Sequence, residues 1–332
     1  MSKQHSYYRI MKQTVIIASL ACLPFVAQAN LLQRNDLQEF INTMVTQHQF
    51  DAARLKSLFS HVHIRPSIIE AISRPAEKKP WSEYRPIFLT DQRINGGVDF
   101  WRQNEKTLAR AEKQYGVPAE IIIAIIGVET RYGRHAGRYK VIDSLSTLAF
   151  DYPPRSAFFR GELEQYLLMT REEGVDPLSL YGSYAGAMGQ PQFISSSYRR
   201  YAIDFDGDGK RDIWKNSADA IGSVANYLST HGWQRGRPIT ARLDNMPTDE
   251  NLLNQSLKPY VKVAELSKEG IDLPIKLPGD EDVTLMSLEG ENGDEYWLGL
   301  NNFYVITRYN HSALYAMAVY QLSQAIRNKR YA

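Results

Sequence analysis

Residues 117–133, which read VPAEIIIAIIGVETRYG, are the part of the sequence that most constrains the fold. Pro118 can begin a helix, because the amide hydrogen that proline lacks would be unpaired at a helix start in any case. The residues from 121 to 126 are apolar almost all the way around such a helix. A helix that is hydrophobic on every side must be buried, so the rest of the chain has to surround it. Gly133 is placed to end this helix.

One acidic residue, Glu129, lies near the end of this apolar helix, with isoleucines one and two turns before it on the same face. Apolar neighbours and the negative end of the helix dipole both disfavour a charged carboxylate, so we expect its pKa to be raised. A carboxylic acid that stays protonated near neutral pH can protonate a leaving oxygen. The residues alone leave an alternative open, in which Glu129 pairs with Arg131 or Arg134 and has only a structural role.

The N-terminus has the pattern of an export signal over residues 1–29. Basic and polar residues precede an apolar run at 15–26, and Ala27-Gln28-Ala29 fits a cleavage site between small residues. The single cysteine of the chain, Cys22, lies inside this signal, so the mature protein needs no disulfide. Residues 19–22, SLAC, resemble a bacterial lipobox imperfectly, which leaves an outer-membrane lipid anchor through Cys22 as the alternative to simple cleavage. We expect a periplasmic protein.

The charge balance excludes one class of partner. The chain has 39 Lys and Arg against 37 Asp and Glu, a net charge of +2, which predicts no strong field for nucleic acid. The 20 Tyr and five Trp residues suit the stacking of sugars, although aromatic side chains also suit protein cores.

Helical patterns cover most of the chain. Asp36 and Asp51 are each placed to cap a helix, and Asn95-Gly96-Gly97 reads as a turn. Pro75 and Pro80 break the helical pattern, and residues 81–86, WSEYRP, are interpreted as an aromatic connection that could line a groove. Helices are predicted at 37–48, 52–60, 65–73, 98–115, 144–149, 157–173, 219–231 and 303–327.

The pattern changes between residues 237 and 304. Residues 238–243 alternate between apolar and polar side chains as a strand does, and three further segments, 261–263, 283–288 and 296–300, are separated by stretches rich in turn residues. A small β subdomain inserted into a helical protein is therefore predicted.

Residues 204–212, DFDGDGKRD, match the start of an EF-hand calcium loop, with acids at alternate places and glycine at the sixth. The twelfth place is Lys215 instead of glutamate, so we expect a longer loop that Asp219 closes. The alternative is an acidic turn without metal. The expected ligands of a structural Ca²⁺ are Asp204, Asp206, Asp208, the carbonyl of Lys210, and Asp219.

Four segments together resemble the membrane-bound lytic transglycosylase B family: IIGVETRYGRHAG, YGSYAGAMGQPQF, DFDGDG followed by WKNSADAIGSVANYL, and NNFYVITRYNHSALYAMAVYQL. The resemblance covers nearly all of the chain after the signal. It implies a mainly α (α+β) fold with a lysozyme-like core, an α domain, a small β domain and an EF-hand-like loop in the core. It also implies cleavage of the β-1,4 bond between N-acetylmuramic acid (MurNAc) and N-acetylglucosamine (GlcNAc) in peptidoglycan, without water, to give 1,6-anhydromuramoyl ends.

By this resemblance Glu129 is the single catalytic acid and base, and Asp151 and Glu162 are capping or surface residues. The resemblance also implies a groove that binds the glycan through hydroxyl, amide and aromatic side chains. The corresponding residues are Tyr84, Arg155, Ser183, Gln192, Phe193, Tyr227, Tyr309 and Asn310.

The implied domains are a signal peptide at 1–29, an α domain of 36–109 with 219–236, a catalytic core of 110–218 with 301–332, and a β domain of 237–300. Peptidoglycan glycan strands are the expected partner, with cell-wall synthesis or division proteins as candidate protein partners, and no organic cofactor is expected. Two other functions stay open: a hydrolytic muramidase of the goose-lysozyme type, and a peptidoglycan-binding protein without catalysis.

Overall fold

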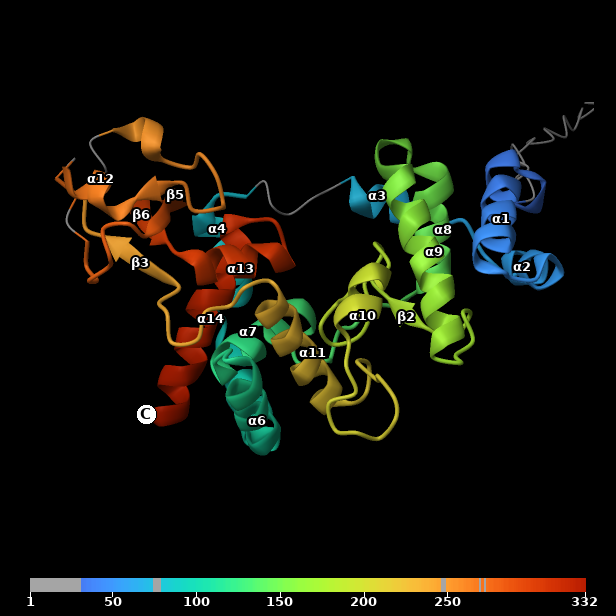
Figure 1. The fold of residues 1–332 in the computed structure, drawn as a ribbon, viewed down its shortest axis with the longest axis horizontal. Helices are drawn as coiled ribbons and strands as arrows, with labels where there is room; N and C mark the ends of the chain where they lie inside the picture. The colour runs from blue at the N-terminus through green and yellow to red at the C-terminus, as the bar shows by residue number, and fades with distance from the viewer. Residues whose placement is uncertain (1–30, 74–78, 246–248, 269, 272) are drawn as a thin grey trace, which may run out of the picture.

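The computed structural model describes residues 31–332 apart from 74–78, 246–248, 269 and 272. The predicted export signal and Cys22 lie outside the described residues. Helices make up most of the structure, and a small antiparallel sheet of four strands lies at one end (Figure 1). This arrangement confirms the expected mainly α (α+β) class.

The apolar helix predicted from residues 117–133 is α7 (Ala119–Thr130), and its residues from Ile121 to Ile126 are buried. Helix α14 packs along α7, and α5, α6 and α11 contact it as well. The α7 helix is therefore enclosed by other helices, as its all-round hydrophobicity requires. The helices of this group are α4 (Trp81–Phe88), α5 (Asp91–Gln103), α6 (Glu105–Tyr115), α11 (Ser217–Thr230), α13 (Asn301–Tyr309) and α14 (Ala313–Tyr331).

A second group of helices lies to the right in Figure 1. Helix α3 packs on α8, and α8 packs on α9. Asp51 caps α2 as predicted, since its side chain accepts the amide hydrogen of Arg54 at 2.7 Å. The elements of this group are η1 (Leu31–Gln33), α1 (Asn35–His48), α2 (Ala52–Phe59), α3 (Pro66–Ile72), α8 (Val141–Asp151), η3 (Pro153–Arg155), α9 (Ser156–Glu172) and α10 (Ser195–Tyr201). The domain boundaries given above stay a prediction.

Several local predictions were wrong. Asp36 does not cap the first helix; it lies in the first turn of α1, whose N-cap residue is Arg34. Residues 81–86 belong to helix α4, in which Trp81 and Tyr84 are buried, so packing outweighs the flanking prolines. Gly96 and Gly97 lie inside α5 instead of forming a turn, and the chain breaks later, at Asn104. A Cβ atom at Gly97 would come within 2.5 Å of Ile326 and 2.8 Å of the Tyr132 hydroxyl, so glycine is needed there for close helix packing.

The four predicted strands are confirmed as β3 (Thr240–Leu243), β4 (Val261–Lys262), β5 (Asp282–Gly290) and β6 (Gly293–Gly299). Their order in the sheet is β3-β6-β5-β4, all antiparallel, and β5 and β6 form a hairpin. The sheet has its own small core with α12 (Val263–Lys268), separate from the large helical core. A two-stranded sheet of β1 (Tyr139–Lys140) and β2 (Tyr181–Gly182) lies among the helices.

Candidate functional site

Glu129 lies in the last turn of α7, where the helix ends in an unusual backbone conformation. The helix ends at Thr130, and Arg131, Tyr132 and Gly133 follow with φ of 51°, 62° and 82°. The prediction that Gly133 ends the helix was therefore wrong, because Arg131 is the C-cap residue and has the left-handed conformation. The Thr130 hydroxyl donates to the carbonyl oxygen of Gln190 at 2.8 Å, which fixes the end of α7.

The Glu129 side chain is half-buried, so it keeps some contact with solvent although apolar residues surround it. Burial raises its pKa from 4.5 to about 7, against the opposing effects of a hydrogen bond from Tyr315 and the positive charge of Arg93. The Tyr315 hydroxyl donates to Glu129 Oε1 at 2.6 Å. Within the described residues, neither Arg131 nor Arg134 forms an ion pair with Glu129. The alternative in which Glu129 serves only as the partner of one of these arginines is therefore not supported.

Arg93 is a residue of the site that the sequence reasoning missed. It is buried, and its guanidinium donates to the carbonyl oxygens of Gly127 and Val128 in the last turn of α7. It also lies over the Phe88 ring, 5.1 Å from the centroid. Arg93 thus offsets the negative end of the helix dipole where Glu129 lies. A basic residue 36 positions earlier in the sequence gives no local signal of this contact.

An aromatic cluster lies beside the acid. The ring of Tyr309 is parallel to that of Tyr315, with 6.4 Å between centroids, and the Glu129 charge contributes to a raised pKa at Tyr309. Phe193 and Tyr227 contact Tyr309 at 5.9 and 4.8 Å between centroids. Three residues predicted to bind the glycan, Phe193, Tyr227 and Tyr309, are therefore gathered near Glu129, and Tyr315 is a fourth aromatic neighbour that the prediction did not include.

Ser183 and Gln192 lie in the glycine-rich segment next to this cluster. Ser183 Oγ accepts the amide hydrogens of Ala185 and Ala187, at 3.3 and 3.1 Å. Gln192 has a φ of 52°, and its side-chain amide donates to the carbonyl oxygens of Ala136 and Gly189. Both polar groups are held by the backbone around them, which orients them.

The other three residues predicted to bind the glycan have different surroundings. Tyr84 is buried on α4, with its ring 5.0 Å from Phe88. Arg155 is exposed and lies over the Phe158 ring at 4.3 Å. Asn310 is half-buried between α13 and α14.

The two other acids have structural roles. The Asp151 carboxylate pairs with Arg34. Glu162 is buried, so it is not a surface residue, and it accepts the amide and hydroxyl hydrogens of Ser196 at 2.9 and 2.6 Å at the start of α10. Burial, Tyr315 and Arg93 are the causes that shift the pKa of Glu129, and no carboxylate is among them.

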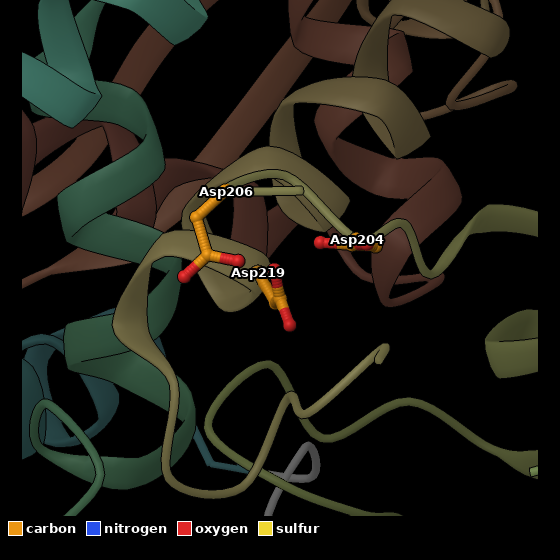
Figure 2. A group of neighbouring side chains, drawn as sticks. All are labelled: Asp204, Asp206 and Asp219. Carbon is orange, nitrogen blue, oxygen red and sulfur yellow. The ribbon is translucent and has the colours of Figure 1, made fainter. Parts of the chain in front are cut away.

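Three predicted metal ligands come together. Figure 2 shows the carboxylates of Asp204, Asp206 and Asp219 turned toward a common space, and one oxygen of each lies within 4.8 Å of the others. Asp219 is buried at the start of α11, and burial together with the charges of Asp206 and Asp204 raises its pKa. Oxygen ligands of this kind suit Ca²⁺, and a divalent cation would offset their mutual repulsion.

The loop itself is held by hydrogen bonds to two of these acids. Asp204 accepts the amide hydrogens of Gly207 and Gly209, at 2.7 and 2.8 Å. Asp219 accepts those of Phe205 and Asp212, at 2.7 and 2.8 Å. Asp208 is not part of the three-acid group; its carboxylate accepts the Lys210 amide hydrogen at 2.9 Å. The residues present therefore fit a cation, with Asp208 and the Lys210 carbonyl as ligands that stay predicted.

No helix in the described part of the chain is both long enough and apolar enough to span a bilayer.

Known proteins resemble this chain over most of its length. The sequence model of the Transglycosylase SLT domain family matches residues 32–324. The chain is 44% identical over 299 residues to the membrane-bound lytic murein transglycosylase B of Escherichia coli strain K12, which covers 87% of this chain and 82% of that protein.

Solved structures of lytic transglycosylases also match this chain over most of its length. SltB1 of Pseudomonas aeruginosa matches with a TM-score of 0.86 and 53% identity, over 90% of this chain and 99% of that one. E. coli Slt35, solved in complex with calcium, matches with a TM-score of 0.84 and 42% identity, over 92% of this chain and 99% of that one. P. aeruginosa SltB3, solved in complex with NAG-anhNAM-pentapeptide, matches with a TM-score of 0.77 and 33% identity, over 88% of this chain and 79% of that one. The chain therefore belongs to the lytic transglycosylases of the Transglycosylase SLT domain family, enzymes that act on peptidoglycan.

Proposed function

We propose that Glu129 is the single general acid and base with which this lytic transglycosylase cleaves the β-1,4 bond between MurNAc and GlcNAc. The protonated carboxyl group gives its proton to the glycosidic oxygen, and the bond from that oxygen to C1 of MurNAc breaks. The carboxylate then takes the proton of the C6 hydroxyl while O6 bonds to C1, which gives a 1,6-anhydromuramoyl end. No water is consumed, and Glu129 ends the cycle protonated.

One observation carries this proposal: the pKa of Glu129 is about 7 in a half-buried position. At that value the group is partly protonated at neutral pH, so it can act first as an acid and then as a base. Most glycosidases use a second carboxylate, which serves as nucleophile or activates water. None interacts with Glu129 within the described residues, which favours the route without water, in which the N-acetyl group of the substrate stabilises the cationic centre.

The glycan would lie against the aromatic cluster and the glycine-rich segment. Phe193, Tyr227 and Tyr309 offer ring faces for sugars, and Ser183 and Gln192 offer oriented polar groups for sugar hydroxyls and N-acetyl groups. Tyr84, Arg155 and Asn310 are proposed to complete the groove. The ligand in the SltB3 complex named above supports a peptidoglycan strand as the occupant.

Ca²⁺ is proposed to bind at Asp204, Asp206 and Asp219 and to stabilise the loop between α10 and α11. The calcium complex of Slt35 supports this assignment. Calcium here would hold the loop in place and take no part in bond cleavage. The protein is proposed to reach the periplasm by the export signal at 1–29, either freed by cleavage or anchored through Cys22.

The test of the catalytic assignment is digestion of purified peptidoglycan by the wild type and by Glu129→Gln, followed by mass analysis of the fragments. We expect anhydro ends, one water lighter than hydrolytic ends, from the wild type and no new ends from the variant. Ends of hydrolytic mass would instead show a muramidase, and cleavage by the variant would exclude Glu129 as the acid.

A further inference from the structure

A cavity of about 780 Å³ lies where the end of α9, strand β2 and residues 210–215 of the metal loop meet. Its lining includes neither Glu129 nor any residue predicted to bind the glycan. The loop after α10 is next to β2 and the end of α9 in Figure 1. The volume is within the range of sites that bind small ligands, roughly 300–1,000 Å³.

The lining of the cavity has more cations than acids, with Lys210, Arg211 and Lys215 against Glu173 and Asp212. Arg211 pairs with Glu173, and Asp212 Oδ1 accepts two backbone amide hydrogens of the turn that follows it, both at 2.9 Å. The ammonium groups of Lys210 and Lys215 have no ion-pair partner within the part of the chain that the structure describes. Two cations are therefore available to an anionic ligand.

Exposed apolar side chains also line this cavity. Val175 and Tyr181 are among the few exposed large hydrophobic residues, with 37% and 49% of their surfaces accessible. The Trp214 indole donates to the carbonyl oxygen of Tyr181 at 3.3 Å, and its ring lies 5.6 Å from that of Tyr198, so the aromatic wall is fixed. Rigid aromatic surface beside free cations suits a ligand that is partly apolar and negatively charged.

We propose that this cavity binds a short peptide with free carboxylates, the class to which the stem peptides of peptidoglycan belong. A neutral sugar would leave the two ammonium groups without partners, and a nucleic acid needs a stripe of cations instead of one pocket. The identity of the peptide rests on the proposed function, because only a peptidoglycan substrate brings such peptides to the protein. The enzyme would thereby hold the peptide of a strand at a place other than Glu129.

The test is isothermal titration calorimetry of the full-length mature protein with a synthetic stem pentapeptide and with the same peptide in which the carboxylates are amides. We expect saturable binding of the first and binding weaker by about tenfold for the second, since a charge-assisted hydrogen bond lost is worth roughly that factor. Lys215→Glu and Tyr181→Ala should each weaken binding of the pentapeptide by about tenfold or more.

Matched controls are Lys106→Glu and Tyr331→Ala, which change an exposed lysine and an exposed tyrosine outside the cavity. They should bind the pentapeptide as the wild type does. Binding should also survive in Glu129→Gln, so a failure here is separable from a failure of the catalytic assignment. The proposal is overturned if the wild type does not bind the pentapeptide, or if Lys215→Glu and Tyr181→Ala bind it as tightly as their controls.

Discussion

Replacing Glu129 by glutamine should remove activity and, at alkaline pH, stabilise the fold. Glutamine keeps the size of the side chain and an oxygen that can accept the Tyr315 hydroxyl hydrogen, but it cannot titrate. In the wild type, burial raises the pKa of Glu129 from 4.5 to about 7. Between these two pH values the folded state holds a proton that the unfolded state has released. The folded state thus binds more protons, so the free energy of unfolding falls as pH rises through this window.

The size of the effect follows from the two pKa values. Each unit of difference corresponds to about 1.36 kcal/mol, so a carboxylate at Glu129 destabilises the fold by at most about 3 kcal/mol above pH 7. Glu129→Gln should recover up to that amount at pH 8 and none of it below pH 4.5. Loss of the proposed proton donor should reduce cleavage by about 10³-fold or more, within the range for general acid–base catalysis.

Urea unfolding of the wild type and the variant at pH 4 and pH 8, with calcium held constant, measures the difference. Glu70→Gln is the matched control, because Glu70 is exposed on α3 and lies outside the site. Equal stability changes for Glu129→Gln at both pH values would refute the reasoning about the pKa. Retained cleavage would refute the catalytic role.

Three further predictions test other parts of the structure. Tyr315→Phe removes a donor that lowers the pKa of Glu129, so the alkaline limb of the kcat/KM profile should move up by about one to two pH units; a limb that stays or moves down contradicts this. Calcium should raise the Tm of the wild type but not of Asp219→Ala, measured by differential scanning calorimetry; an equal rise in both would place the ion elsewhere. Gly97→Ala should destabilise the fold by about 1–3 kcal/mol in urea unfolding because its Cβ would clash with α14, whereas Gly161→Ala, with nothing within 4 Å of its Cβ, should not destabilise it.

The sequence predicted those parts of the fold in which the local pattern and the tertiary structure agree. A helix that is apolar on every side, such as α7, has to be buried. Alternation at 238–243 and turn-rich stretches around three further segments predicted the four strands of the larger sheet. Helix α4 was missed because Pro75 and Pro80 break the sequence pattern, although Pro80 is the N-cap of the helix and even Pro86 is accommodated within it. Burial of Trp81 and Tyr84 against distant parts of the chain decides this case, and no window of sequence contains that information.

The site shows the same limit. Local pattern identified Glu129 and the direction of its pKa shift, and the resemblance to known proteins supplied the aromatic residues around it. Neither the local pattern nor the resemblance could supply Arg93 or the Tyr315 hydrogen bond. Arg93 reaches the end of α7 from α5, and Tyr315 reaches it from α14, 186 residues after Glu129. A resemblance carries over residue types at matching positions, but not the hydrogen bonds between them.

Arg93 and Tyr315 hold the pKa of Glu129 below the value that burial alone would give it. Burial disfavours the carboxylate, which suits a proton donor but not the acceptor that the second half of the proposed reaction needs. The hydrogen bond from Tyr315 and the charge of Arg93 both stabilise the carboxylate and lower the pKa again. An enzyme with two carboxylates can give the two roles different pKa values, whereas one with a single acid has to balance them at one atom. A pKa of about 7 leaves both forms accessible, and the three residues that set it come from three different helices, so it is the packing of α5, α7 and α14 that tunes the acid.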